Sequence, residues 1–100
     1  MTRVTFEKTE DAELEFGFDG SETLETLENI TVATFTFPQG PGELTDLGIV
    51  NDGKRVAQKF GGGTLGQIYL VVAVLDSTGG TIERRYNAAF SIEIIEPQSD

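Results

Sequence analysis

Apolar and polar residues alternate along much of the chain, in segments separated by residues that favour turns. One such segment covers residues 12–18, where the polar side carries Glu13 and Glu15. The apolar side of that segment consists of Ala12, Leu14, Phe16 and Phe18. Alternation with a period of two is typical of a strand that buries one face and exposes the other. The pattern therefore predicts a half-buried β-strand here.

Residues 69–75 differ from this pattern because every position in them is apolar. Such a run predicts a central strand that is covered on both faces. The five residues after it, 76–80, are predicted to form a hairpin loop. The next alternating strand, 82–94, has Arg84 as the one charged residue on its apolar side. This hairpin is the clearest signal of fold in the chain.

Shorter segments complete the pattern. Residues 30–37 are β-branched and aromatic, and their apolar parity changes midway, so the strand is either buried on both faces or interrupted by a bulge. Asn51-Asp52-Gly53 lies between two strand-like runs and predicts a tight hairpin, because such turns need residues that tolerate positive φ. Residues 1–10 predict an N-terminal arm or edge strand, and residues 21–28 predict one short helical turn. Residues 97–100 are expected to fray.

About seven strands at roughly ten-residue spacing favour an all-β fold, an immunoglobulin-like antiparallel β-sandwich with Greek-key connections. One hundred residues match the usual size of one domain, so residues 1–100 are expected to form a single domain.

The composition restricts the chemistry. The chain has no cysteine, histidine or tryptophan, which excludes disulfides, thiolate zinc sites and the usual acyl-transfer triads. The many acids leave calcium binding and paired-carboxylate glycoside chemistry open. However, no D-x-D-x-D-G loop is present, and a small sandwich rarely has a deep cleft. We therefore expect no enzyme activity, no cofactor and no metal site.

The net charge is −10, and it is concentrated in residues 1–30, which hold nine acids and two bases. This charge argues against nucleic acid and anionic membranes, because phosphate binding needs a basic footprint. The N-terminal residues lack the apolar segment of a secretion signal, and no apolar run approaches the ~20 residues of a membrane span. We expect synthesis in the cytoplasm and either a basic protein partner or a surface kept soluble by its charge.

The loop of residues 61–66 formally matches G-x-G-x-x-G. A dinucleotide site needs a helix after those glycines, whereas a strand follows here. The loop is therefore interpreted as a tight connection between two sheets. Tyr69, with Gly66 before it, fits a tyrosine corner, whose hydroxyl bonds to upstream backbone. The alternative is an exposed aromatic side chain in a ligand site. Gly53, Gly66 and Tyr69 are thus expected to be structural.

Four charged residues are candidates for a protein interface: Arg84, Arg85, Glu13 and Glu15. Arg84-Arg85 is one of two local basic pairs, and Lys54-Arg55 is the other. Strand-end ion pairs with nearby acids are the simpler explanation for the arginines. The glutamates equally fit the solvent face of an antiparallel strand.

A resemblance to a known family rests on turn motifs of the second half. These are Gly62-Gly63-Thr64, Gly66 and Tyr69, the 76–80 segment, and Glu83-Arg84-Arg85 before the closing strand. This combination resembles small immunoglobulin-like proteins from the head-gene clusters of tailed bacteriophages. The layout of residues 14–37 is similar as well, although Phe35 stands where those proteins commonly have tryptophan.

The resemblance implies a structural protein on the exterior of the virion, most simply a capsid decoration or cement protein. Its partners would then be the major capsid protein, copies of itself, or both. A neck, tail or head-fibre accessory module is the alternative within this class. A carbohydrate- or host-surface-binding sandwich is the alternative outside it, and it would need aromatic residues on an exposed face.

Overall fold

The computed structural model describes residues 4–21 and 24–97, and these form an all-β structure. Its strands are β1 (Val4–Lys8), β2 (Leu14–Asp19), β3 (Asn29–Thr36), β4 (Leu44–Asn51), β5 (Arg55–Gly62), β6 (Ile68–Gly79) and β7 (Ile82–Ile94). The number of strands and their order along the chain confirm the all-β prediction.

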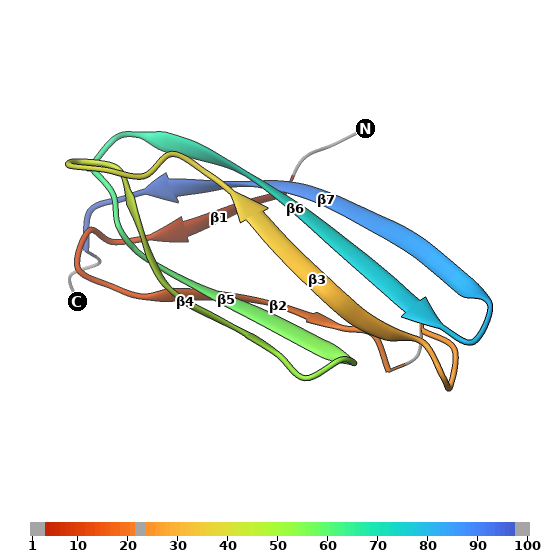
Figure 1. The fold of residues 1–100 in the computed structure, drawn as a ribbon. Helices are drawn as coiled ribbons and strands as arrows, with labels where there is room; N and C mark the ends of the chain where they lie inside the picture. Colours follow the sequence, from red (N-terminus) through yellow and green to blue (C-terminus); the bar gives the residue numbers. More distant parts are fainter. Residues whose placement is uncertain (1–3, 22–23, 98–100) are drawn as a thin grey trace.

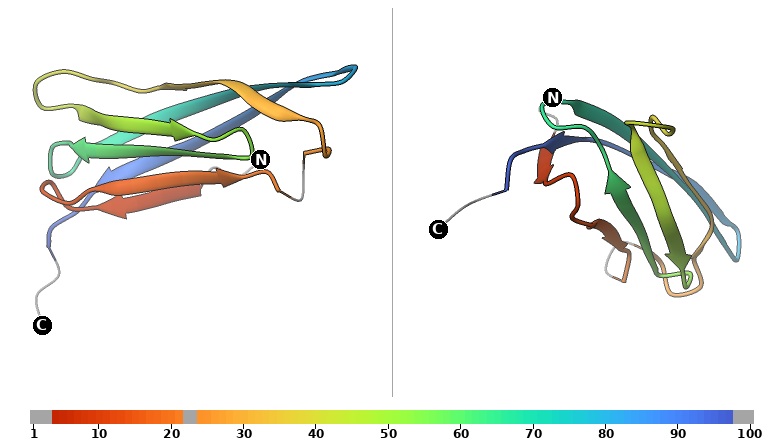
Figure 2. Two further views of the ribbon diagram at one scale, coloured as in Figure 1. Left: turned by 60° about the horizontal axis from the view of Figure 1, so that its bottom comes forward. Right: turned by 90° about the vertical axis from the view of Figure 1, so that its left-hand side faces the viewer.

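The strands form two sheets that pack face to face, so the predicted β-sandwich is confirmed (Figure 1). One sheet has the order β1-β7-β6-β3, and the other has the order β2-β5-β4. All neighbouring strands are antiparallel except β1 and β7, which run parallel. β6 and β7 are the longest strands, and their hairpin extends beyond the tip of the β4–β5 hairpin (Figures 1 and 2).

The core between the sheets combines aliphatic side chains with a group of aromatic rings in contact. Phe60 on β5 is fully buried, and its ring centroid lies 4.9 Å from that of Phe37 and 6.0 Å from that of Phe90. Phe16 on β2 stacks against Phe90 with centroids 4.4 Å apart. Large aromatic side chains contribute strongly to core energetics. The inward positions of the alternating strands therefore build the core, as the sequence pattern predicts.

Two local features of the strands follow the sequence closely. The pairing of β3 with β6 shifts register between Ile30 and Val32, so the bulge is the correct alternative for this strand. Ile30 is buried in the core and Val32 is exposed as a result. The β4–β5 hairpin turns at Gly53, whose φ of 96° is a conformation that glycine adopts without strain.

The short helical turn expected at residues 21–28 is wrong for the described part of that segment. Ser21 and residues 24–28 form turns and bends, and no helix occurs there. The Ser21 N–H bonds to the carboxylate of Asp19, and the Leu24 N–H bonds to the carbonyl of Gly20. The backbone donors are therefore satisfied by local turns that carry the chain from one sheet to the other.

The hairpin loop expected at residues 76–80 is also wrong, because β6 continues through Gly79 and the turn is formed by Gly80 and Thr81. Gly79 is therefore part of a strand and not of a loop. A Cβ atom at this position would collide with the backbone of Leu27 and Glu28 in the β2–β3 connection. The glycine therefore permits close packing of that connection on β6.

A third correction concerns the apolar run of residues 69–75. β6 is central in its sheet, but the described residues cover only one of its faces. Tyr69, Val71, Ala73 and Leu75 point into the core and are buried. The side chains between them lie on the outer face of the sheet. The continuous apolar pattern thus describes a strand whose second face is left open.

Candidate functional site

The open face of β6 is the first candidate site, and we call it the apolar face. It consists of Ile68, Leu70, Val72 and Val74. Ile68 is 61% exposed and Leu70 is 41% exposed, while Val72 and Val74 are half-buried. Isolated exposed aliphatic side chains are normal, but a row of them on one strand marks a site of interaction.

The strands beside β6 add small, uncharged side chains to the apolar face. The register places Ser91 next to Leu70 and Ala89 next to Val72. On the other side, Thr36 pairs with Val72 and Thr34 pairs with Val74. Charge appears only toward the ends of this row, where Glu93 pairs with Ile68 and Asp76 pairs with Arg85. The middle of the face is therefore flat and uncharged.

Asp76 and Arg85 neutralise each other at one end of the apolar face. The Arg85 Nε atom lies 2.7 Å from the Asp76 carboxylate. The hydrogen bond from Arg85 holds the pKa of Asp76 below its usual value, and the same contact raises the pKa of Arg85. A partner that covers the middle of this face meets little unpaired charge from this end.

The outer face of the other sheet carries more charge. The register places Glu15 beside Lys59 and Asp19 beside Arg55, so charges of opposite sign alternate across β2 and β5. The Arg55 guanidinium lies 3.6 Å from the Asp19 carboxylate, and both groups are exposed. The edge strand β4 also exposes aliphatic side chains: Leu47 is 44%, Ile49 42% and Val50 69% exposed. This sheet therefore differs from the apolar face in the charged pairs of β2 and β5.

The four predicted interface residues are not brought together. Glu15 lies on the outer face of the three-stranded sheet, and Glu13 precedes that strand. Arg85 lies on the outer face of the four-stranded sheet, where it pairs with Asp76. Arg84 instead faces the β2–β3 connection, where it pairs with Glu25 and Glu28. The arginines thus form the ion pairs that were the simpler explanation.

Tyr69 ties together the connections at one end of the sandwich. Its hydroxyl accepts a hydrogen bond from the Thr64 N–H at 3.0 Å and donates one to the Gly42 carbonyl at 2.8 Å. The nearby Gly66 has a φ of 88°, and its N–H bonds to the Ile94 carbonyl. We call the contacts of Tyr69 with Thr64 and Gly42 the tyrosine end. This is the geometry that a tyrosine corner requires.

A fully buried residue, Glu28, holds the opposite end together, and no motif in the sequence predicts its role. The Glu28 carboxylate accepts hydrogen bonds from the Ser77 hydroxyl, the Tyr86 hydroxyl at 3.1 Å and the Glu25 N–H at 3.0 Å. Arg84 Nε lies 3.4 Å from the same carboxylate. We call the contacts of Glu28 with Ser77, Tyr86 and Arg84 the carboxylate end.

These contacts make the Glu28 carboxylate stable in its charged form. The Ser77 hydroxyl contributes most, and together with the other donors it holds the pKa of Glu28 below its usual value of 4.5, although burial acts in the opposite direction. Lys54 adds to the same region because its ammonium donates to the carbonyls of Glu25, Thr26 and Glu28. The network is structural, since all of its groups are satisfied by one another.

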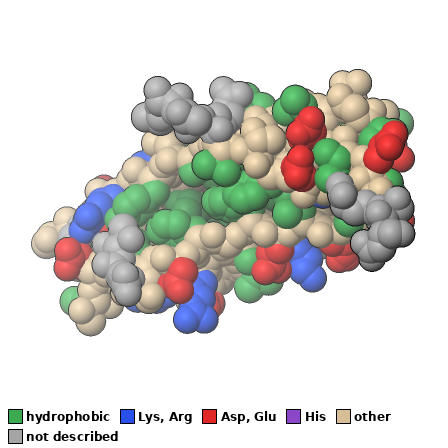
Figure 3. Space-filling model, turned by 180° about the vertical axis from the view of Figure 1, so that it is seen from behind, with side chains coloured by type: hydrophobic (Ala, Val, Ile, Leu, Met, Phe, Trp, Pro, Cys, Tyr) green, Lys and Arg blue, Asp and Glu red, His purple; other side chains and the backbone are tan. Residues whose placement is uncertain are grey.

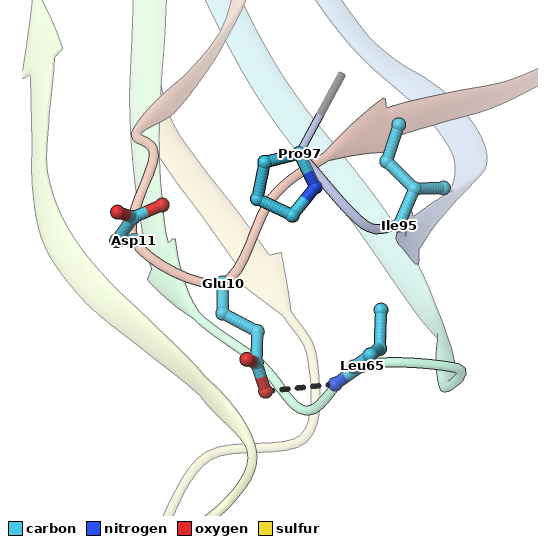
Figure 4. Close-up of a pocket in the computed structure, with 5 residues that line it drawn as sticks. All are labelled: Glu10, Asp11, Leu65, Ile95 and Pro97. Atoms are coloured by element: carbon cyan, nitrogen blue, oxygen red, sulfur yellow. Dashed lines mark hydrogen bonds between the residues drawn. The ribbon is translucent and has the colours of Figure 1, made fainter. Parts of the chain in front are cut away.

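A further hollow lies beside the C-terminal end of β7 (Figure 4). It has a volume of about 250 Å³ and is lined by Glu10, Asp11, Leu65, Ile95 and Pro97. The Glu10 carboxylate already accepts a hydrogen bond from the Leu65 N–H at 2.9 Å. One of the two carboxylates beside this hollow is therefore already engaged by the backbone.

Two further features concern the described residues: metal-ligand clusters and helices long enough to cross a membrane. Within residues 4–21 and 24–97, no group of three acidic, histidine or cysteine side chains is placed to hold a metal ion. In that part of the chain no helix has the length and apolar character needed to span a bilayer.

A small β-sandwich with an exposed apolar sheet face belongs to the class of binding and assembly modules. Comparison with known families agrees with this class and narrows it. Residues 8–93 match the gp77 family, described as podophage GP4 fiber-tail adaptor protein, and the chain belongs to this family. It is therefore a structural protein of a phage virion. No curated protein matches the chain.

The family confirms the predicted virion protein at this coarser level. It does not test the finer expectation of a capsid decoration protein bound to the major capsid protein, and it fits the predicted tail module about as well.

Proposed function

We propose that this protein is an adaptor that joins a tail fibre to the phage tail, and that the apolar face is where it docks on one of these two partners. The family description supports the fibre and tail as partners. The observation that carries the docking surface is the exposed row of aliphatic side chains along the outside of β6.

The physical argument begins with the open strand face. A strand that is apolar at every position usually has both faces covered, whereas the residues that the structure describes cover only one face of β6. The molecule measures 50 × 28 × 25 Å, so a face along β6 has room for a patch of the ~800 Å² that each partner buries in a standard interface. Because the middle of the face carries no charge, the matching surface is an uncharged, apolar patch on a virion protein.

The test compares two exposed aliphatic residues on opposite faces. Leu70→Asp places a carboxylate in the apolar face, and Val50→Asp places the same group on the other sheet. Phage that lack the gene are complemented with each variant, and fibres on purified virions are counted by electron microscopy. We expect few or no fibres with Leu70→Asp and normal fibre numbers with Val50→Asp, with similar melting temperatures for both proteins. Fibres that attach normally with Leu70→Asp would refute the docking surface.

The same particles distinguish the adaptor from a capsid decoration protein. An adaptor is detected by immunogold labelling at the junction of tail and fibre, and its copy number follows that of the fibres. A decoration protein labels the head, and its copy number follows that of the capsid protein. Labelling of the head, with fibres present on virions that lack the gene, would replace the adaptor with the capsid function expected from the resemblance.

A further inference from the structure

The two sheets leave a long edge open on one side of the sandwich. β1 pairs with β7 only from Phe90 to Ile94. Along Ile82–Ala89, β7 pairs with β6 on one side, and no described strand pairs with it on the other. β2 lies across from this half of β7 and pairs only with β5 among the described strands. We call Ile82–Ala89 of β7 the open edge.

The open edge presents backbone groups that are able to pair with another strand. The Ile94 N–H points to the β6 side, where it donates to the Gln67 carbonyl, whereas the Ile95 N–H donates to Lys8 on the β1 side. The register of β7 with β6 is continuous, so this direction alternates along the strand. The N–H and C=O groups of Glu83, Arg85 and Asn87 therefore point away from β6, toward the open side.

An apolar hollow lies between the open edge and β2. It has a volume of about 160 Å³ and is lined by Phe16, Phe18, Ala73, Leu75, Tyr86, Asn87 and Ala88. The rings of Phe18 and Tyr86 are 6.0 Å apart, which places β2 against this half of β7. Figure 3 shows hydrophobic side chains gathered along a hollow between the two layers on this side. The hollow is the position that a further strand of the sandwich would fill.

The charges along the open edge favour a basic occupant. Arg85 is paired with Asp76, and Arg84 is paired with Glu25 and Glu28. Glu83 lies on the same face of β7 as Arg85 and takes part in no ion pair within the described residues. The charge left without a close partner along this edge is therefore a carboxylate, and the net charge of the chain is −10.

We propose that an extended segment of a partner protein adds to the open edge as a strand, with alternate apolar side chains in the hollow and lysine or arginine side chains toward Glu83 on the outer face. Strand addition to an exposed sheet edge is a general mode of peptide recognition, in which main-chain bonds give affinity and alternate side chains give specificity. This step rests on the proposed function only for the identity of the partner as a tail or fibre protein.

The charge of the chain argues against a second copy in this place. The net charge of −10 on each copy opposes such a contact. A basic segment from another protein does not meet this repulsion.

The test uses a short peptide of sequence KVTVKVTV, with EVTVEVTV as its matched acidic control, added to the full chain. Amide hydrogen exchange is followed by NMR. We expect KVTVKVTV to slow exchange of the Arg85 and Asn87 amides by about tenfold or more, and to change the exchange of the β4 amides little. EVTVEVTV should have little effect on the exchange of any of these amides. Equal effects of the two peptides, or protection confined to β4, would overturn the proposal.

Two substitutions keep the proposal testable if one of them disturbs the fold. Asn87→Pro removes an N–H that points outward, and edge positions tolerate proline. Ala88→Trp fills the hollow with a side chain of the chain itself. Each is expected to abolish the protection by KVTVKVTV, and retained protection in a folded Ala88→Trp protein would refute the occupied hollow.

These results are independent of the fibre experiment. If KVTVKVTV does not bind while Leu70→Asp virions lose their fibres, only the strand-addition proposal fails. If the peptide binds while virions without the gene keep their fibres, only the adaptor function fails.

Discussion

The two ends of the sandwich are held together by different chemistry. At the tyrosine end, one hydroxyl bonds to two backbone groups, the Thr64 N–H and the Gly42 carbonyl. At the carboxylate end, one buried charge collects two hydroxyls, a backbone N–H and a guanidinium. The contacts of the tyrosine end are uncharged, and one of them joins residues that are close in the sequence. The carboxylate end is charged, and its hydroxyl contacts join residues that are 49 to 58 positions apart.

This difference has consequences for stability. Neutral hydrogen bonds contribute modestly to stability, and backbone partners do not titrate. A buried charge is costly to leave without its partners, and its contribution depends on pH. The carboxylate end should therefore dominate both the response to mutation and the response to acid.

The largest effect is expected from Glu28→Ala. This change leaves the hydroxyls of Ser77 and Tyr86 and the Arg84 guanidinium without their common acceptor. We expect the melting temperature, measured by circular dichroism, to fall by roughly 10–20 °C. Glu25→Ala is the matched control, because Glu25 reaches the same arginine from an exposed position and should change the melting temperature little. Equal losses for the two variants would contradict the special role of Glu28.

Acid should weaken the carboxylate end selectively. The pKa of Glu28 is lowered in the folded protein, so the unfolded chain takes up its proton first as the pH falls. Stability is therefore present above about pH 4.5 and is lost as the pH falls further through the folded pKa values. Asp19 and Asp76 have lowered pKa values as well and contribute to the same loss.

Glu28→Gln separates these contributions. The variant is expected to be less stable than the native protein at neutral pH and to lose less additional stability between about pH 6 and pH 3, as measured by urea unfolding. Parallel pH profiles for the two proteins would show that Glu28 does not carry the acid sensitivity.

Tyr69→Phe should have a smaller effect at the other end. Removing the hydroxyl leaves the Thr64 N–H and the Gly42 carbonyl without this partner, which costs about 1–2 kcal/mol of unfolding free energy. Because both partners are backbone groups, the loss should be the same at neutral pH and near pH 4. Hydrogen exchange of the Thr64 amide provides a local check, and an unchanged exchange rate would refute the tyrosine-corner role.

The smallest effect is expected from Arg85→Ala. Its ion pair with Asp76 is well aligned at 2.7 Å, but the arginine side chain is largely exposed. Exposed pairs of this kind contribute less than about 1 kcal/mol, and the contribution falls with added salt. Arg55 makes a longer contact of 3.6 Å with Asp19, so Arg55→Ala should lower the unfolding free energy, measured with urea, by even less. A loss from Arg85→Ala that equals that of Glu28→Ala would contradict the comparison between exposed and buried charge.

Much of the fold could be predicted because alternation and turn residues act locally. Phe16 and Phe18 pack against the core, on the inward face that their positions in the alternating segment indicate, and the hairpin turns at Gly53 as the turn residues predict. The predictions failed at residues 21–28 and at the 76–80 segment. In both places, contact between these two distant segments overrides the local signal, as the collision of a Cβ at Gly79 with the Leu27 backbone shows.

The candidate site could be predicted only in part, because exposure is a property of the whole assembly. The apolar run from Tyr69 to Leu75 predicts a strand that is covered on both faces, but among residues 4–21 and 24–97 only one face of β6 is covered. The four charged residues chosen from the sequence lie on separate surfaces. The alternation along a strand shows which residues share a face, but it does not show to which sheet the strand belongs. The role of Glu28 could not be predicted, because its partners Ser77 and Tyr86 lie 49 and 58 residues further along the chain.

The amino-acid sequence by itself determined the all-β class, the parity of the core residues and the hairpins, because these depend on period-two alternation and on the conformational preferences of turn residues. Only the tertiary structure decided which face of β6 stays open, which half of β7 lacks a neighbour and which carboxylate is buried. These properties depend on how the two sheets and their connections are placed in space, and they are the ones that bear on assembly.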